Sequence, residues 1–250
     1  MRTALNTRYI GFNNQTKPFD SDDLRRAFAQ AVDREQIARD VLGNEVVPAT
    51  RILPPGMVGT QLEIKPLAFD LAAAQAALAH AGFPGGTSMP PISLACAPEG
   101  ENELVVRALQ QAWSQNLGVT VALRAMDTSA FSDALNQTWL NPQTGLQIYY
   151  SVWGADYPDP QNFLSLQLLS TSRNNNGHWC DPLFDQIISE ADRISARAQI
   201  QRRLLLYNQA EQIAIDQVGW LPILHTKVHL LIQPRVQGIL VTPSGLITPD

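Results

Sequence analysis

The spacing of apolar residues predicts most of the helices and strands. In residues 20–32 they recur every three to four positions, which is the period of one helix face. That face comprises Leu24, Ala27, Phe28, Ala31 and Val32. Asp20 is expected to be the N-cap and Asp23 the third helical residue, because carboxylates there meet free backbone N–H groups. Residues 33–42 continue the helical pattern, and Gly43 is a typical helix stop.

The middle of the chain alternates strand and helix patterns. Residues 92–97 and 119–126 are short apolar runs that predict strands. The helix predicted between them, over 101–118, has an apolar stripe of Leu104, Val105, Ala108, Leu109, Ala112 and Trp113. This order predicts a βαβ unit with parallel strands and a right-handed crossover. A short helix near 128–137 and a strand over 146–153 extend the pattern, so the predicted fold class is α/β.

Two more helices are expected towards the C-terminus. Asp181 suits an N-cap and Pro182 the first helical position. The buried stripe of this helix is expected to be Phe184, Ile187, Ile188, Ala191 and Ile194. A longer helix is expected over 195–217. The side chains expected to face the core are those of Ile200, Leu204, Tyr207, Ala214 and Val218.

Three further segments complete the pattern. Residues 70–81 are rich in alanine and predict a helix, which Gly82 and Pro84 end. The stretch 46–59 is rich in proline and glycine and is expected to be irregular. The apolar segment 221–241 is rich in β-formers and no predicted helix follows it.

Composition excludes several classes of protein. The 250 residues are 45% hydrophobic, so the chain has enough apolar surface to fold. The net charge is −5, and the longest basic clusters are the pairs Arg25-Arg26 and Arg202-Arg203, so the footprint that nucleic acid requires is missing. No apolar run approaches the length of a membrane span. The first residues lack the apolar segment of a secretory signal, so the protein is cytoplasmic or its leader lies outside this sequence.

Two aspartates stand three residues apart in WGADYPDPQNF, residues 153–163. Asp159 precedes Pro160 and an apolar run, which is typical of a helix N-cap. Asp156 follows the predicted strand 146–153, and ligands of open α/β sheets bind beyond the ends of such strands. A loop aspartate bonded to its own backbone is an alternative interpretation of Asp156. A catalytic pair of carboxylates is a third.

Aromatic residues surround these aspartates in the sequence. Tyr149, Tyr150, Trp153 and Tyr157 crowd one predicted strand end. Such crowding is typical of a ligand cleft, because pockets are lined by aromatic side chains and a few polar groups. A carboxylate among them suits a cation with an apolar neighbour.

Other site chemistry is not indicated. His178 and Cys180 are two residues apart and His225 and His229 four apart, but a zinc site takes three or four ligands and no compact third ligand is evident. Serine nucleophile elbows, phosphate loops and dinucleotide glycine motifs are absent, so we expect no cofactor and no metal. Cys96 and Cys180 fit one disulfide or unpaired thiols equally well.

Four blocks of the sequence together resemble a known family. YIGFNNQTKPFDSDDLRRAFAQAVDREQI resembles the start of the second lobe of extracellular solute-binding proteins of the oligopeptide/dipeptide type, family 5, which serve ABC importers. WGADYPDPQNFL resembles the cleft segment of that family. HWCDPLFDQIISEA and RLLLYNQAEQIAIDQVGWLPIL resemble its closing helices and return strand. The blocks follow one another in the family's order.

The resemblance implies one lobe of a two-lobed, Venus-flytrap binding protein. Since members are longer, it implies that the preceding lobe lies outside this sequence. Residues 1–225 would form the second lobe, and residues 226–250 a return tail that joins the missing one. The apolar part of that tail, 228–241, would then have no partner within this chain. Exposed strand edges pair readily, so either homodimer contacts through this tail or disorder of the tail is expected.

The resemblance also assigns a site. Asp156 matches by position the family aspartate that receives the α-ammonium of a bound peptide, with Tyr150, Trp153, Gly154, Ala155 and Tyr157 around it. Some oligopeptide binders carry an arginine a few residues before this aspartate, where this chain has tyrosines. The peptide's length therefore stays open, and so does its identity, because the family also carries sugars and nickel complexes.

The implied function is solute capture without chemistry. A peptide or similar amine-bearing solute would bridge two lobes and shift an open–closed equilibrium that an ABC permease reads. The implied location is extracellular or periplasmic, with a membrane anchor on the full-length protein. A single lobe is expected to fold but to bind peptides weakly or not at all. A hydrolase using Asp156 and Asp159, and a stand-alone interaction domain, are the alternatives.

Overall fold

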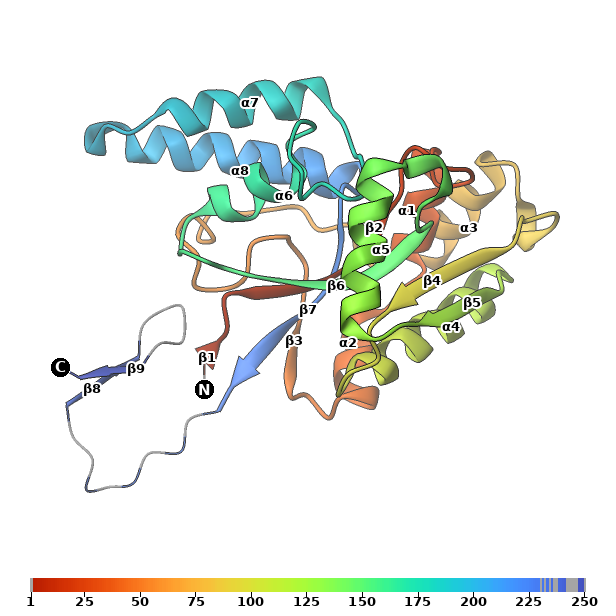
Figure 1. Cartoon of the computed structure of the whole chain (residues 1–250), viewed down its shortest axis with the longest axis horizontal. Coiled ribbons are helices and arrows are strands. Elements are labelled where there is room, and N and C mark those ends of the chain that lie inside the picture. The colour runs from red at the N-terminus through yellow and green to blue at the C-terminus, as the bar shows by residue number, and fades with distance from the viewer. Residues whose placement is uncertain are drawn as a thin grey trace.

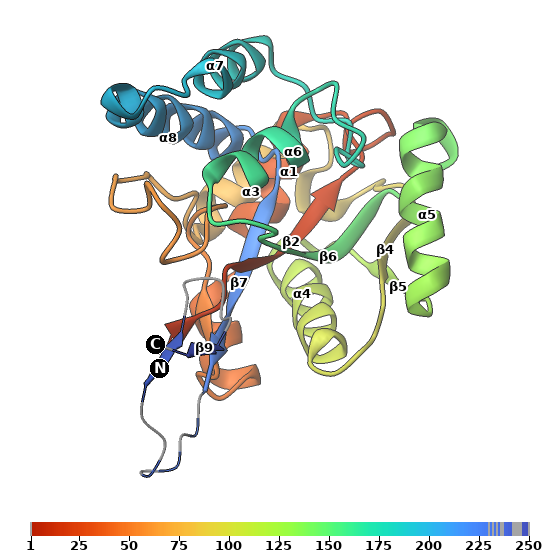
Figure 2. The same cartoon turned by 60° about the vertical axis from the view of Figure 1, so that its left-hand side comes forward.

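A mixed sheet of seven strands forms the centre of the computed structural model (Figures 1 and 2). The structure describes residues 2–229, 231, 233, 235, 238–241 and 247–249. The strand order is β1-β7-β2-β6-β4-β5, and β3 also pairs with β7. The strands are β1 (Arg2–Thr3), β2 (Asn6–Phe12), β3 (Val46–Pro48), β4 (Ile92–Cys96), β5 (Val121–Ala125), β6 (Ile148–Gly154) and β7 (Leu221–Val228). A separate pair comprises β8 (Ile239–Val241) and β9 (Ile247–Pro249).

The predicted βαβ unit is confirmed. Strand β4 pairs in parallel with both β5 and β6. Helix α4 (Asn102–Leu117) connects β4 to β5 and ends at Gly118, whose φ of 69° favours glycine. Helix α5 (Thr128–Leu140) connects β5 to β6. The parallel strands therefore end at a common edge, the edge from which the chain leaves β6.

The remaining helices cover the two faces of the sheet. One face carries α1 (Asp22–Gln30), α2 (Arg34–Gln36) with a π-helical turn (Ile37–Val41), α3 (Leu71–His80) and α4. The other face carries α5, α6 (Leu164–Leu168), α7 (Pro182–Arg193) and α8 (Ile200–Asp216). Helices α7 and α8 run side by side (Figure 1). Each face has its own apolar core, so the sheet is buried on both sides.

The N-terminal strand β2 lies in the middle of the sheet but is not predicted by the apolar pattern. It pairs antiparallel with β6 from Asn6↔Gly154 to Phe12↔Ile148, and with β7 on its other side. Both its faces are buried near its end, so apolar and polar residues do not alternate there. Gly11 is required, because a Cβ at this position would lie 2.2 Å from the Tyr149 ring.

Several helix predictions are confirmed and others need correction. The apolar face predicted for α1 is fully buried. Its N-cap, however, is Ser21, whose hydroxyl accepts from Leu24 N–H at 3.3 Å, so the expectation for Asp20 is wrong by one residue. The helical pattern does not run on through residue 33, because Asp33 caps a new helix through Gln36 N–H at 2.9 Å. Ile200 is 38% exposed at the start of α8 rather than inward.

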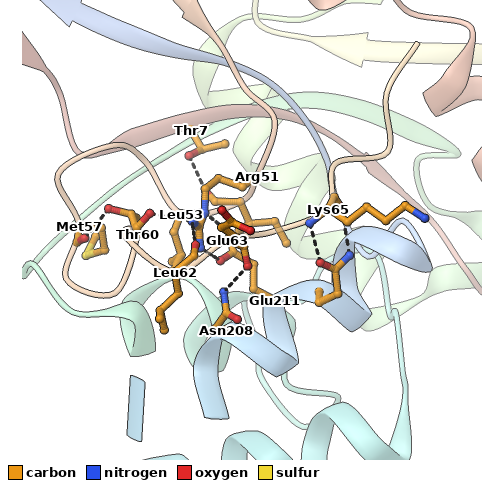
Figure 3. A network of polar contacts seen from close by, with 12 residues as sticks. Thr7, Arg51, Leu53, Met57, Thr60, Leu62, Glu63, Lys65, Asn208 and Glu211 are labelled. Carbon is orange, nitrogen blue, oxygen red and sulfur yellow. Dashed lines mark hydrogen bonds and ion pairs between the residues drawn. The ribbon is translucent and has the colours of Figure 1, made fainter. Parts of the chain in front are cut away.

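The stretch expected to be irregular is held in place by a buried ion pair (Figure 3). Arg51 donates from Nε to Oε1 of Glu211 at 3.2 Å, and its Nη2 pairs with the second carboxylate oxygen. Leu53 N–H donates to Glu211 Oε1 at 2.8 Å, and Arg51 Nη1 donates to the carbonyl oxygens of Thr60 and Leu62. Glu211 on α8 is fully buried. This pair therefore ties the segment between β3 and α3 to α8.

His225 on β7 is a buried, neutral histidine. The Thr7 hydroxyl donates to Ile52 O at 2.8 Å, so towards His225 it can only accept. Nδ1 of His225 lies 3.1 Å from both Thr7 Oγ1 and Asn6 O, two acceptors, which assigns the proton to Nδ1. Burial lowers the pKa of His225 to about 4.

This buried histidine predicts a loss of stability in acid. The unfolded chain takes up the proton below about pH 6.5, but the folded chain only below about pH 4, so stability falls as the pH drops from 6.5 towards 4. We expect the wild type to lose about 2–3 kcal/mol more than His225→Asn between pH 7 and pH 4.5, measured by urea denaturation. Equal losses in the two proteins would contradict this assignment.

Candidate functional site

The predicted ligand segment forms the loop between β6 and α6. Strand β6 ends at Gly154, which pairs with Asn6 of β2. The next residue, Ala155, donates its N–H to Leu5 O at 2.7 Å, so the chain stays fixed for one residue beyond the strand. Asp156 follows, at the edge where the parallel strands end. In open α/β sheets this edge is where ligands bind.

The carboxylate of Asp156 is exposed and carries no intramolecular cation. Its Oδ2 accepts from Asn162 Nδ2 at 3.2 Å, and its backbone N–H donates to Asn162 Oδ1 at 3.2 Å. Among the residues that the structure describes, no lysine, arginine or histidine pairs with it. An exposed carboxylate that pairs with no cation can still accept hydrogen bonds from a positively charged ligand group.

Asp159 has a structural role, as the Asp-Pro sequence predicts. It caps the 3₁₀ turn Pro160–Asn162 by accepting from Gln161 N–H at 2.9 Å. Arg203 of α8 binds both its oxygens, at 2.7 and 2.9 Å. Because Arg203 already binds both oxygens of Asp159, neither oxygen is free to act on a substrate beside Asp156, and the catalytic-pair interpretation gains no support from the geometry.

The other predicted site residues lie on β6 or on the loop that follows it: Tyr150, Trp153 and Gly154 belong to the strand, and Ala155 and Tyr157 to the loop. Trp153 donates its Nε1–H to Asn162, with both the backbone oxygen and Oδ1 at 3.0 Å. Tyr157 is 38% exposed and donates its hydroxyl to Gln161 Oε1 at 2.7 Å. Gly154 and Ala155 lie between Trp153 and Asp156 in the chain. Asn162, which the sequence analysis did not single out, bonds to both Trp153 and Asp156.

The strand alternation places Tyr150 away from this group. Successive side chains of β6 point to opposite faces, so Tyr149 and Trp153 share one face and Tyr150 the other. Tyr149 packs edge-on against Tyr9, with ring centroids 6.3 Å apart, in the core beneath α6 to α8. Tyr150 is buried in the opposite core, so the four predicted aromatics do not line one surface. Burial raises the pKa of the Tyr150 hydroxyl, which therefore stays protonated.

Tyr150 lines a hollow of about 270 Å³ beside the ends of β4 and β6. Its walls are mainly apolar and come from β6, α5 and the loop after β4. They include Ala97, Phe131, Leu135 and Val152, with Glu99 and Asn102 as polar members. The hollow and the Asp156 loop thus lie along the same strand, on consecutive parts of β6 and its continuation.

The histidines and cysteines form no alternative centre. Within the described ranges, no group of three His, Cys, Asp or Glu side chains is arranged to hold a metal ion. His178 Nε2 lies 3.0 Å from Trp139 O, and His225 is buried as described above. Cys96 is buried, Cys180 is exposed, and both are free thiols. In the described part of the chain, no helix is both long and apolar enough to cross a membrane.

The chain belongs to the bacterial extracellular solute-binding proteins of family 5. The model of that family's middle region matches residues 2–175, and this confirms the resemblance stated from the sequence. The α/β class and the binding-protein fold are also confirmed, because the solved structures that match are periplasmic binding proteins.

Individual relatives cover nearly the whole chain. It is 32% identical over 241 residues to the probable deoxycholate-binding periplasmic protein YgiS of Escherichia coli, a match covering 94% of this chain and 42% of that protein. It is 29% identical to the dipeptide-binding protein DppE of Bacillus subtilis, covering 96% and 44% respectively. The chain therefore spans less than half the length of these relatives.

Solved structures match this chain over about half of their length or over all of it. The murein tripeptide binding protein MppA of Escherichia coli superposes with a TM-score of 0.80 at 26% identity, covering 98% of this chain and 46% of MppA. A chain described as a peptide-binding protein of a peptide ABC transporter superposes at 0.78 and 22% identity. There the match covers 90% of this chain and 100% of the other. A fold of about this extent thus exists as a solved chain by itself.

Proposed function

We propose that this chain is the second lobe of a two-lobed receptor that captures peptides, or similar amine-bearing solutes, for an ABC importer. Residues 1–225 form the ligand-binding lobe, and residues 226–250, eleven of which lie outside the described residues, lead to the other lobe. The observation that carries the proposal is Asp156, an exposed carboxylate beyond β6 that pairs with no cation in the described part of the chain. A protonated amine is a ligand group that forms strong, charge-assisted hydrogen bonds with such a carboxylate.

The receptor works by binding alone. A peptide whose ammonium pairs with Asp156 contacts the other lobe at the same time and stabilises the closed form, which the permease recognises. Trp153, Gly154, Ala155 and Tyr157 surround the ammonium, and the hollow beside Tyr150 lies further along the strand. The relatives are binding proteins, and this supports a function without catalysis. The full-length protein acts outside the cytoplasm, held at the membrane.

The charge of the loop discriminates between solute classes. One relative is named for deoxycholate, which is an anion at neutral pH. Asp156 would repel an anionic group placed beside it, because like charges in a desolvated cleft are unfavourable. The names of DppE and MppA refer to peptides, which carry an ammonium group. The exposed carboxylate therefore favours peptides over a bile acid.

The proposal is tested with the full-length receptor and a peptide pool. Native mass spectrometry of the receptor mixed with a tryptic digest of casein identifies the peptide that binds most tightly. Calorimetry then compares this peptide with its N-acetyl derivative, which lacks the ammonium. We expect the free amine to bind at least about 30-fold more tightly, because the derivative leaves Asp156 unpaired in the closed cleft. Retention of deoxycholate instead of any peptide would overturn the proposal.

A further inference from the structure

A single buried amide bonds to two residues of the candidate site. Asn162 ends the 3₁₀ turn Pro160–Asn162, and its exposure is 0%. Its side chain makes three hydrogen bonds, one with Trp153 and two with Asp156. None of these bonds goes to the core around it. A buried asparagine has to satisfy its amide, and this one does so entirely with residues that face the proposed ligand.

The orientation of the amide follows from its partners. The indole N–H of Trp153 and the backbone N–H of Asp156 are both donors, so the group between them is the oxygen Oδ1. Nδ2 then faces Oδ2 of Asp156 and donates to it at 3.2 Å. Asp156 and Asn162 thereby form a closed pair of bonds, one in each direction. One carboxylate oxygen is held, and the other is left for a ligand.

The turn that carries Asn162 is itself fixed to the helices. Asn162 N–H donates to Asp159 O at 3.0 Å, and Asp159 is bound through both oxygens by Arg203 on α8. Arg203 also donates to the Tyr207 hydroxyl at 2.9 Å. A continuous set of bonds therefore connects helix α8 to the exposed carboxylate. The loop is ordered before any ligand arrives, and this reduces the entropic cost of binding.

We propose that Asn162 is a positioning residue, which holds the Asp156 carboxylate and the Trp153 indole in the geometry that receives the ligand's ammonium. This inference rests on the proposed function and adds to it the group that orients the anion. Without Asn162, the exposed Asp156 side chain regains its rotamers, and its backbone N–H loses its acceptor. Binding of the ammonium should then weaken selectively, while contacts to the rest of the peptide persist.

The test uses Asn162→Ala in the full-length receptor, with the selected casein peptide and its N-acetyl derivative. We expect the affinity for the free amine to fall about tenfold or more, as for loss of a hydrogen bond to a charged group, and that for the N-acetyl form to stay within about twofold. If Asn162→Ala yields no folded protein, Asn162→Ser leaves a smaller cavity and should change the affinity ratio in the same direction.

Asn175→Ala is the matched control for a structural effect. Asn175 is also a buried asparagine of this lobe, but its amide bonds to Trp179 and to backbone oxygens of α6 and the following loop. We expect its removal to lower the melting temperature while leaving the ratio of the two affinities unchanged. An Asn162 variant that weakens both ligands equally, as a merely structural residue would, overturns the inference, and so does one that weakens neither.

Asp156→Asn measured in parallel separates the two levels of the proposal. If Asp156→Asn lowers the affinity for the free amine and Asn162→Ala does not, the positioning role is wrong and the ammonium site stands. If Asp156→Asn has no effect, the ammonium site and the positioning role both fail. Selective loss in both variants supports both.

Discussion

Replacing Glu211 by alanine should lower the free energy of unfolding of this lobe by about 3–5 kcal/mol, the usual cost of leaving one partner of a buried ion pair alone. Glu211 is completely buried and Arg51 is nearly so, at 12% side-chain exposure. The variant leaves the Arg51 guanidinium with only two carbonyl oxygens, from Thr60 and Leu62, and removes the acceptor of Leu53 N–H. Urea denaturation followed by circular dichroism measures the change.

The size of this effect depends on burial and not on the presence of an ion pair. Glu190 pairs with Arg202 at the surface, where the side chains are 43% and 64% exposed. Glu190→Ala is therefore the matched control, and we expect it to cost less than about 1 kcal/mol. The double variant Arg51→Met/Glu211→Leu should recover much of the loss, because it leaves no charge unpaired. A cost for Glu211→Ala as small as that for Glu190→Ala would show that water reaches Arg51.

The elements that the sequence predicts are those whose signal is local. The βαβ unit is confirmed because its strands are short apolar runs and its helix ends at a glycine with positive φ. Strand β2 lacks such a signal, since it is buried on both faces and contains Gly11, which is required only because the Tyr149 ring lies against it. The short strand β3 lies in a proline-rich stretch whose order comes from Arg51 and Glu211, which are 160 residues apart.

The candidate site shows the same limit. The Asp-Pro pair was sufficient to predict that Asp159 caps a helical turn, and this separates it from Asp156. The bond from Asp159 to Arg203 spans 44 residues and has no local signature. Asn162 could not be singled out either, because the inward face of a single 3₁₀ turn follows from its packing and not from a repeating pattern. The alternation of side chains along β6 is a local property, and it places Tyr149 and Tyr150 on opposite faces of the sheet.

Asp156→Asn should lower the affinity of the full-length receptor for amine-bearing peptides by about 30-fold to several thousand-fold, that is about 2–5 kcal/mol. Asparagine has the same shape and can still accept the bond from Asn162 Nδ2, so the loop geometry is kept and only the charge is removed. The ligand ammonium would then be desolvated on closure without an anion beside it. Calorimetry with the selected peptide measures the change.

The same substitution should matter far less in this lobe alone. Asp156 is exposed here, and an ion pair in water contributes little because solvent screens it. Only closure of the other lobe over Asp156 would exclude water and strengthen the pair. Asp70→Asn is the matched control, since Asp70 is an exposed cap of α3 on the other face and asparagine also caps helices well. A two-lobed Asp156→Asn receptor that binds peptides as tightly as the Asp70→Asn receptor would remove Asp156 from the site. An equally large loss in the single lobe would show instead that the charge acts without closure.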